Sequence, residues 1–360
     1  MVELLDRAAA DGHTALPWSV AAPALAASGA QAERLARDAV ASGEVTAVLL
    51  GDTRALALSE HVAAEKDVAD VVGQLTDDHR LRVRLSGVDD QDSPDADTFV
   101  LGDAHRLGSV TLAQRLKDAP ATATVTLMGD PDLLGPFGAG APFRDIVAAV
   151  RRWSPGVSLT ERVVRPADDS TDDSTAPIRD VVASVRRGEL PAVHSHRHSV
   201  VVAAAPDDPT LARRVGQLVT DSIPRVFGLP ADQIAVVTPL SGGPCGASAL
   251  HETLAGQATV RLVRDAEPDR WAAVVAVYPA QAAGVLSRPL VLTGMTRARH
   301  HLSLVVADGC DIAAAVARLG HRPRTTILPS LLAQLWSPAP HHVDLGLDVH
   351  VDLPGTLSTP

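Results

Sequence analysis

Three histidines at alternate positions form the most compact group of candidate metal ligands in the sequence. His194, His196 and His198 lie in the strand-like run HSHRH. Alternate side chains of an extended strand project from one face, so these imidazoles could share one divalent cation. A metal site needs a further carboxylate or histidine, and the spacing fixes none. We therefore predict no metal site.

Phosphate chemistry would need a glycine-rich loop that ends in lysine, with the pattern GxxxxGK[ST]. Such a loop directs backbone N–H groups and one ammonium group at the β- and γ-phosphates. The only lysines are Lys66 and Lys117, and neither follows a glycine. The turn SGGPCG around Cys245 could cradle an anion through its backbone, although glycine and proline there also simply make a loop.

The overall composition indicates a folded protein with two domains and room for a small third. The chain has 360 residues, of which 46% are hydrophobic and 21% charged. Its net charge of −11 disfavours a surface that tracks a phosphate backbone throughout, so any nucleic-acid contact must be local. Two cysteines, an acidic start and the lack of a long apolar run predict a cytoplasmic location without a membrane span.

The first 60 residues predict a small α+β domain. Alanine-rich segments at 3–10 and 21–28 and the run QAERLARDAVASG have helical patterns, and VTAVLL and TRALAL form a hairpin pattern around Gly51-Asp52. Three helices and a hairpin suggest a winged-helix-like domain over 1–60. Arg34 and Arg37 on the third helix are its DNA-binding candidates, although neighbouring carboxylates offset their charge. The alternative is a small packing or protein-contact domain.

The rest of the chain alternates helix patterns with strand patterns such as DTFVLGD, TATVTLMGD, AAVVAVYP and HLSLVVAD, which is typical of α/β domains with parallel sheets. One such domain is expected over 61–165. The acidic, Ser/Thr-rich stretch PADDSTDDSTAP then provides a plausible linker. A second α/β domain is expected over 166–337, and the tail at 338–360 is rich in Pro, His and Asp and is expected to be weakly ordered.

Three further segments carry a family resemblance. They are TFVLGDAHRLGSVTLAQRLKDAPATATVTLMGDPDLLGPFGAGAPFRDIV at 98–147, IPRVFGLPADQIAVVTPLSGGPCGASALHETL at 223–254 and VLSRPLVLTGMTRARHHLSLVV at 285–306. Respectively, they resemble the Walker B and GDPDQLP region, the start of the second motor domain, and motif VI of RecD-like superfamily 1 DNA helicases (exodeoxyribonuclease V alpha-subunit-like). The resemblance covers most of residues 10–335 and implies two RecA-like domains of the P-loop NTPase fold, reduced in size here.

The resemblance implies roles for four residues. Asp103 matches the water-activating glutamate of Walker B, and Arg297 matches the arginine finger of motif VI, so both are catalytic candidates. Asp130, Arg165 and Arg297 would form a vestigial nucleotide site. The alternatives are a turn or helix-capping role for Asp130 and ordinary surface ion pairs for the arginines.

The sequence also departs from the family pattern. Gly102 replaces the magnesium-binding aspartate, and Leu133 replaces the glutamine that senses the γ-phosphate. A glycine side chain cannot bind a metal ion. The chain also leaves no room after Leu254 for the small β-barrel insert and the HKSQG motif of relatives.

These features favour a helicase-like protein of DNA repair or recombination that lacks ATPase activity and acts as an accessory that binds DNA or a protein partner. No cofactor is then expected. The alternative is an active ATP-dependent DNA helicase, or a helicase subunit whose phosphate site is completed in trans, which would use Mg-ATP. A decayed gene product is the third hypothesis.

Overall fold

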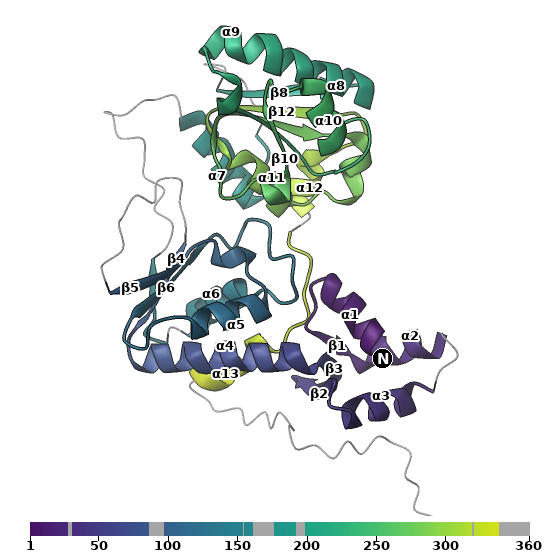
Figure 1. The fold of residues 1–360 in the computed structure, drawn as a ribbon, viewed down its shortest axis with the longest axis vertical. Helices are drawn as coiled ribbons and strands as arrows, with labels where there is room; N and C mark the ends of the chain where they lie inside the picture. The colour runs from purple at the N-terminus through teal and green to yellow at the C-terminus, as the bar shows by residue number, and fades with distance from the viewer. Residues whose placement is uncertain are drawn as a thin grey trace, which may run out of the picture. The chain divides into compact units, whose positions relative to one another are not determined.

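The computed structural model describes residues 1–27, 31–85, 97–153, 155–160, 176–191, 199–318 and 320–337. The chain divides into two compact units (Figure 1). The first unit comprises Met1–Pro131, Gly135–Val163 and Pro323–Pro360, and the second comprises Asp132–Leu134 and Val164–Arg322. No helix in the described ranges is long and apolar enough to span a bilayer.

The first unit begins with the predicted small α+β domain. Its elements are α1 (Val2–Ala10), β1 (Ala15–Pro17), α2 (Trp18–Ala27), α3 (Ala32–Ala41), β2 (Val45–Leu50) and β3 (Thr53–Leu58). The β2–β3 hairpin turns at Gly51, whose φ of 60° suits a residue without a Cβ. Strand β1, which the sequence did not indicate, pairs antiparallel with β3 and completes a three-stranded sheet.

A four-stranded, all-parallel sheet in the order β5-β6-β4-β7 follows. Its strands are β4 (Leu81–Leu85), β5 (Thr98–Leu101), β6 (Thr124–Gly129) and β7 (Ser158–Thr160). Its helices are α4 (Ser59–Asp77), the 3₁₀ turn η1 (Ala104–Arg106), α5 (Ser109–Lys117), α6 (Pro142–Trp153) and α13 (Leu328–Trp336).

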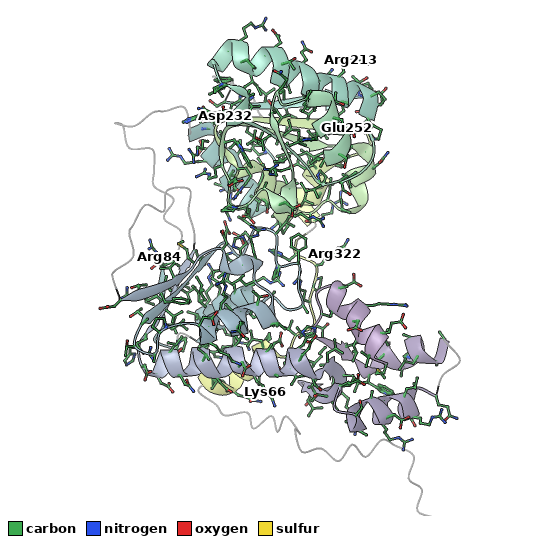
Figure 2. The ribbon with its side chains drawn as sticks, viewed as in Figure 1. Lys66, Arg84, Arg213, Asp232, Glu252 and Arg322 are labelled. Atoms are coloured by element: carbon green, nitrogen blue, oxygen red, sulfur yellow. The ribbon has the colours of Figure 1, made fainter. Side chains whose placement is uncertain are left out.

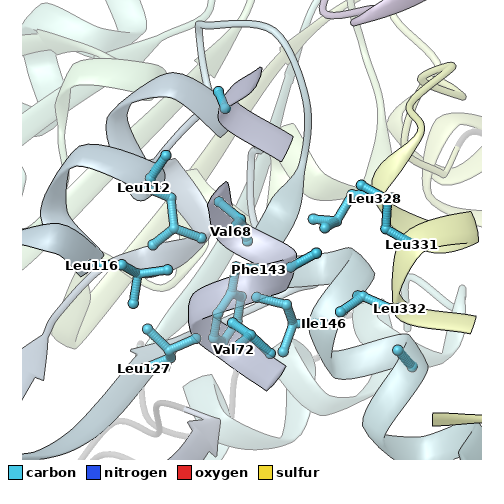
Figure 3. Close-up of a cluster of buried hydrophobic side chains, with 14 of the residues drawn as sticks. Val68, Val72, Leu112, Leu116, Leu127, Phe143, Ile146, Leu328, Leu331 and Leu332 are labelled. Carbon is cyan, nitrogen blue, oxygen red and sulfur yellow. The ribbon is translucent and has the colours of Figure 1, made fainter. Parts of the chain in front are cut away.

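The two faces of this sheet differ in chemistry. Buried apolar side chains such as Val83 and Leu127 form one core with α4, α5, α6 and α13. Figure 3 labels Leu127 in this core. Alternation places Arg82, Arg84 and Thr126 on the opposite face. Figure 2 labels Arg84 there. Parallel sheets usually bury both faces, so a face with two arginines is unusual.

Helix α13 packs with the first unit, although the sequence analysis assigned residues up to 337 to the second domain. Leu328 and Leu332 are fully buried against α4 and α6 in the core of the first unit (Figure 3). The physical reason is that α4 and α6 leave an apolar surface that the apolar face of α13 fills. The first unit is therefore built from chain segments on both sides of the second.

The second unit is a five-stranded, all-parallel sheet in the order β10-β9-β11-β12-β8. Its strands are β8 (Val200–Ala205), β9 (Ile234–Thr238), β10 (Thr259–Leu262), β11 (Trp271–Tyr278) and β12 (Ala298–Ala307). Its helices are α7 (Ala176–Arg187), α8 (Asp208–Gln217), the π-helical η2 (Leu218–Ser222), α9 (Ile223–Phe227), η3 (Ala231–Gln233), α10 (Ala247–Leu254), η4 (Val263–Asp265), η5 (Ala280–Gly284), α11 (Arg288–Met295) and α12 (Ile312–Arg318).

Separate apolar clusters cover the two faces of this second sheet. One cluster includes Val185 of α7 and Leu292 of α11, and the other includes Leu211 of α8 and Leu250 of α10. On the outer side of α8, Arg213 faces solvent (Figure 2). The predicted fold class, parallel α/β sheets preceded by a small α+β domain, is confirmed.

Candidate functional site

The carboxyl ends of β5 and β6 bring the two candidate aspartates to one edge of the first sheet. Asp130 directly follows β6, and Asp103 lies two residues beyond the end of β5. Ligands of open α/β sheets bind beyond the carboxyl ends of the strands, which is where both aspartates lie.

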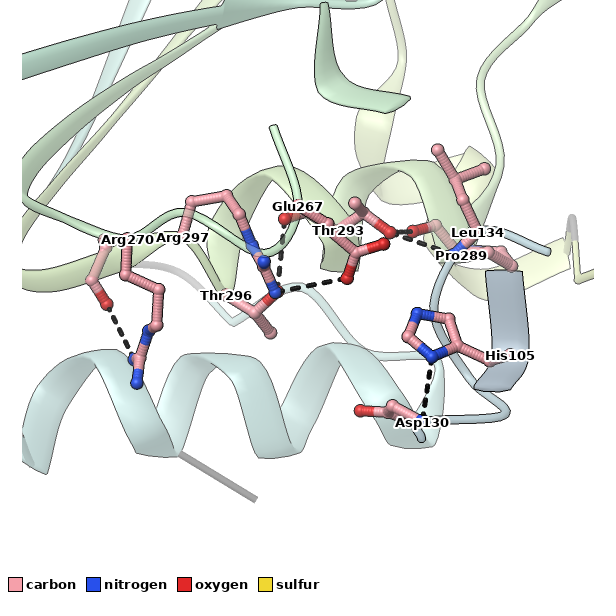
Figure 4. A network of polar contacts seen from close by, with 10 residues as sticks. His105, Asp130, Leu134, Glu267, Arg270, Pro289, Thr293, Thr296 and Arg297 are labelled. Atoms are coloured by element: carbon pink, nitrogen blue, oxygen red, sulfur yellow. Dashed lines mark hydrogen bonds and ion pairs between the residues drawn. The ribbon is translucent and has the colours of Figure 1, made fainter. Parts of the chain in front are cut away.

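His105 forms a hydrogen bond with Asp130 at this edge of the sheet. The backbone N–H of Asp130 donates to Nδ1 of His105 over 3.2 Å, and both residues are almost fully buried. Figure 4 shows this contact. An Nδ1 atom that accepts a hydrogen bond carries no proton, so the proton of a neutral ring lies on Nε2. His105 was not among the predicted site residues, although it lies two residues after Asp103 in the segment at 98–147.

Asp103 occupies a turn. It adopts a left-handed conformation with φ of 50°, which is uncommon for a residue with a side chain, and its carbonyl accepts the N–H of Arg106 over 2.8 Å. A Cβ at Gly102 would meet no atom within 4 Å, so space exists for a side chain at the position of the expected metal ligand. A glycine at that position supplies no carboxylate for a metal ion.

The segment after Asp130 leaves the first unit. Asp132–Leu134 belongs to the second unit, where Leu133 is 5% exposed within the apolar cluster of α7 and α11. Asp132 forms an ion pair with Arg186 at 2.7 Å, and the N–H of Leu134 donates to Oγ1 of Thr293 over 2.9 Å. The position that resembles a phosphate-sensing glutamine therefore holds a packed leucine.

Arg297 lies in the second unit, between the end of α11 and the start of β12 (Figure 4). Its Nη2 lies 3.3 Å from Oε1 of Glu267 and donates to Oγ1 of Thr296 over 3.0 Å. The side chains of Arg297 and Glu267 are only 9% and 3% exposed. This ion pair is buried, unlike the surface pair that the sequence analysis weighed as the alternative. Arg297 therefore already has a counter-charge within its own unit.

The turn at 241–246 does not present free amides to an anion at its helical end. The N–H of Ala247 donates to the carbonyl of Leu240, and that of Ser248 donates to the carbonyl of Ser241. The Sγ of Cys245 is buried and contacts the carbonyl of Asp208 at 3.2 Å. Burial also raises the pKa of the Cys245 thiol to about 11. The geometry favours the loop-forming role of this turn.

A second polar cluster lies inside the first unit, where the chain returns from the second unit. Glu65 is completely buried and accepts hydrogen bonds from the hydroxyl of Ser109 at 2.8 Å and from the N–H groups of Ile327 and Leu328 at 2.8 and 3.0 Å. Burial raises the pKa of Glu65 to about 7. Burial likewise raises the pKa of Asp145, which accepts from Thr326, to about 6.

The remaining candidates lie apart from these sites or outside the described residues. Arg34 and Arg37 are exposed on α3. Arg165 and the histidines at 194, 196 and 198 lie outside the described ranges. No group of three or more His, Cys, Asp or Glu residues within the described ranges is placed to hold a metal ion.

No protein-family description matches the chain, and no curated protein matches it closely. Solved structures with partial similarity include the C-terminal domain of a possible DNA helicase from Lactobacillus plantarum WCFS1, with 16% identity over 44% of this chain and 99% of that chain and a TM-score of 0.30. Arterivirus nonstructural protein 10, a helicase, shows 14% identity over 76% of this chain and 73% of that chain, and the PRRSV helicase 13% over 76% and 60%, each with a TM-score of 0.33. Similarities this low do not bear on activity.

Proposed function

We propose that this chain is a helicase-like protein of DNA repair or recombination that does not hydrolyse ATP and binds DNA or a protein partner as an accessory. The three segments that resemble RecD-like helicases support the family assignment. The proposal that hydrolysis has been lost depends on what the residues at the expected nucleotide positions do.

The buried pair of Arg297 and Glu267 carries the proposal. An arginine finger acts by placing its positive charge on a transferring phosphate. Here the guanidinium lies against a carboxylate inside its own unit. Moving Arg297 onto a phosphate would break this buried ion pair with Glu267, and breaking a buried ion pair is strongly destabilising. Loss of ATP hydrolysis is also supported by the packed Leu133, the missing P-loop lysine and Gly102.

The test measures ATP hydrolysis and DNA binding on the same purified chain. ATP hydrolysis is followed with and without excess single-stranded DNA, beside an active RecD-like enzyme as positive control. DNA binding is followed by the fluorescence anisotropy of a labelled 20-nucleotide strand. We expect no turnover under either condition and measurable DNA binding. DNA-stimulated turnover that is lost in Arg297→Ala would overturn the proposal in favour of the active helicase.

The predicted DNA contact of helix α3 in the N-terminal domain has its own test. If α3 contacts DNA, Arg34→Gln combined with Arg37→Gln should weaken binding, because each exposed guanidinium would lose a phosphate contact. The matched control is Arg213→Gln with Arg214→Gln on α8. Equal affinity of the α3 variant and the wild type would leave α3 with a packing or protein-contact role.

A further inference from the structure

The chain passes back from the second unit into the first at two places, after Leu134 and after Arg322. The first passage opens the loop GPFGAGA at 135–141. The second opens residues 323–328, here called the strap, which lead into α13. Polar contacts within the first unit join the strap to the loop, so the two places of return are held together.

The first half of the strap contacts the loop and the N-terminal domain. The guanidinium group of Arg324 donates to three carbonyl oxygens of the loop, those of Pro136, Gly138 and Gly140. The carbonyl oxygen of Thr325 accepts the N–H groups of Thr14 and Ala15 over 2.9 and 3.2 Å. The N–H of Thr325 donates to Nδ1 of His13 over 3.0 Å. These bonds fix the strap by its backbone as well as by one side chain.

Two carboxyl groups hold the second half of the strap. Oε2 of Glu65, which is completely buried on α4, accepts the N–H groups of Ile327 and Leu328 over 2.8 and 3.0 Å. Asp145 on α6 accepts the hydroxyl of Thr326 over 3.2 Å, and its carboxylate is near enough to repel a charge on Glu65. Three consecutive residues of the strap therefore depend on two neighbouring carboxyl groups.

We propose that the strap is a proton-controlled latch, which is seated while the carboxyl group of Glu65 is protonated and is released when that group ionises. A buried carboxylate is costly unless a cation offsets it, and within the described ranges no basic side chain offsets the charge of Glu65. Release of the strap lets water reach the carboxylate. It also takes Arg324 away from the loop carbonyls, so both places of return are freed together.

The basic side chains of this region act on Asp145. Arg144 on α6 and Arg324 on the strap both favour its ionised form, although burial raises the pKa of Asp145 to about 6. Ionised Asp145 in turn opposes a charge on Glu65. The arginines therefore leave the latch dependent on the protonation of Glu65.

Two histidines complete the titratable groups beside the strap and Glu65. His13 accepts the N–H of Thr325 through Nδ1, so protonation of that atom would remove one bond at acid pH, opposite in direction to Glu65. His61 lies one turn before Glu65 on α4. The loop at 135–141 and α13 contain no ionisable side chain.

The size of the effect follows from the two environments of Glu65. Burial under the seated strap raises the pKa of Glu65 from 4.5 to about 7, and release returns the carboxyl group to water. Protonation therefore favours the seated strap fully below pH 4.5, and this advantage is lost as the pH rises through 7. The equilibrium constant for release should increase about 70-fold between pH 5 and 8 from Glu65 alone.

The test follows hydrogen exchange of the Ile327 and Leu328 amides in the full-length chain by mass spectrometry with electron-transfer fragmentation, at pH 5, 6, 7 and 8. Protection factors correct for the intrinsic pH dependence of exchange. Glu65→Gln keeps the hydrogen bonds and cannot ionise. The contribution of His13 cancels in this comparison, since both chains keep it. Glu60→Gln is the matched control, because Glu60 lies on the same helix with a side chain that is 70% exposed.

We expect the protection factors of both amides to fall about 70-fold from pH 5 to 8 in the wild type and in Glu60→Gln, relative to Glu65→Gln. This exchange should not respond to low urea, because release is local. Parallel pH profiles of the wild type and Glu65→Gln overturn the proposal. Exchange of Ile327 with the same opening free energy and urea dependence as Leu127 in the central strand β6 also overturns it, since the strap would then leave only on global unfolding.

Discussion

Replacing Glu65 with glutamine should make the protein more stable at neutral and alkaline pH. Glu65 lies on the apolar side of α4 with its carboxyl group out of contact with water. Oε2 accepts the N–H groups of Ile327 and Leu328, and Oε1 accepts the hydroxyl of Ser109. In Glu65→Gln, the amide oxygen can accept both N–H groups while the amide nitrogen donates to Oγ of Ser109. The substitution thus keeps all three hydrogen bonds and removes the charge.

The magnitude follows from the pKa of Glu65, which burial raises from 4.5 to about 7. The unfolded chain loses this proton near pH 4.5, whereas the folded chain keeps it until about pH 7. The stabilising contribution of the protonated carboxyl is therefore complete below pH 4.5 and is lost as the pH rises to 7. A difference of about 2.5 pKa units corresponds to roughly 3 kcal/mol. The stability of Glu65→Gln relative to the wild type should rise by that amount between pH 4.5 and 8.

Urea unfolding at pH 4.5, 6, 7 and 8 measures this difference. Trp153 and Trp336 pack beside the core of the first unit, so their fluorescence reports on it, and Trp271→Phe in every compared protein removes the signal from the second unit. Glu60→Gln is the matched control, because Glu60 lies on the same helix with a side chain that is 70% exposed. If Glu65→Gln and the wild type change in parallel over this pH range, the buried-carboxyl reasoning is wrong.

Three further outcomes follow from the second unit. Glu267→Ala should lower the free energy of unfolding by about 3–5 kcal/mol in urea unfolding because it breaks the buried ion pair with Arg297, and Glu267→Leu combined with Arg297→Met should recover most of that loss. Leu133→Gln should lower the unfolding temperature in calorimetry, because it buries an amide among apolar side chains, and under the proposed function it should not create ATP hydrolysis. Cys245 and Cys310, buried with thiol pKa values raised to about 11, should resist iodoacetamide at pH 7.5 in the native protein and react in urea, as mass spectrometry can show.

The sequence predicted the elements whose pattern is local. The runs TATVTLMGD, AAVVAVYP and HLSLVVAD form β6, β11 and β12, because central strands of parallel sheets are near-continuous apolar runs. The run DTFVLGD forms the edge strand β5. Strands β1 and β10 were not predicted. Each is short, with three or four residues, and exists because a longer neighbouring strand offers it hydrogen bonds. A local pattern does not contain that information.

The sequence could not predict contacts between distant segments. Glu65 and Ile327 are 262 positions apart, and the assignment of 323–337 to the second domain failed to anticipate that contact. The buried pairing of Arg297 with Glu267 was missed for the same reason. A local signal for Glu65 did exist, since it lies three residues from both Val62 and Val68 on the buried face of α4. A carboxylate on an apolar stripe indicates a buried polar partner.

The way the chain satisfies these buried groups bears on whether it is a decayed gene product. Most substitutions destabilise, and a stability of 5–15 kcal/mol disappears after a few of them. A chain without selection would lose its buried polar contacts early, because one unpaired charge costs several kcal/mol. Here Glu65 accepts three hydrogen bonds. Arg297 forms an ion pair with the carboxylate of Glu267 and donates to the hydroxyl of Thr296. Such specific contacts favour a protein whose fold is maintained by selection over a decayed gene product.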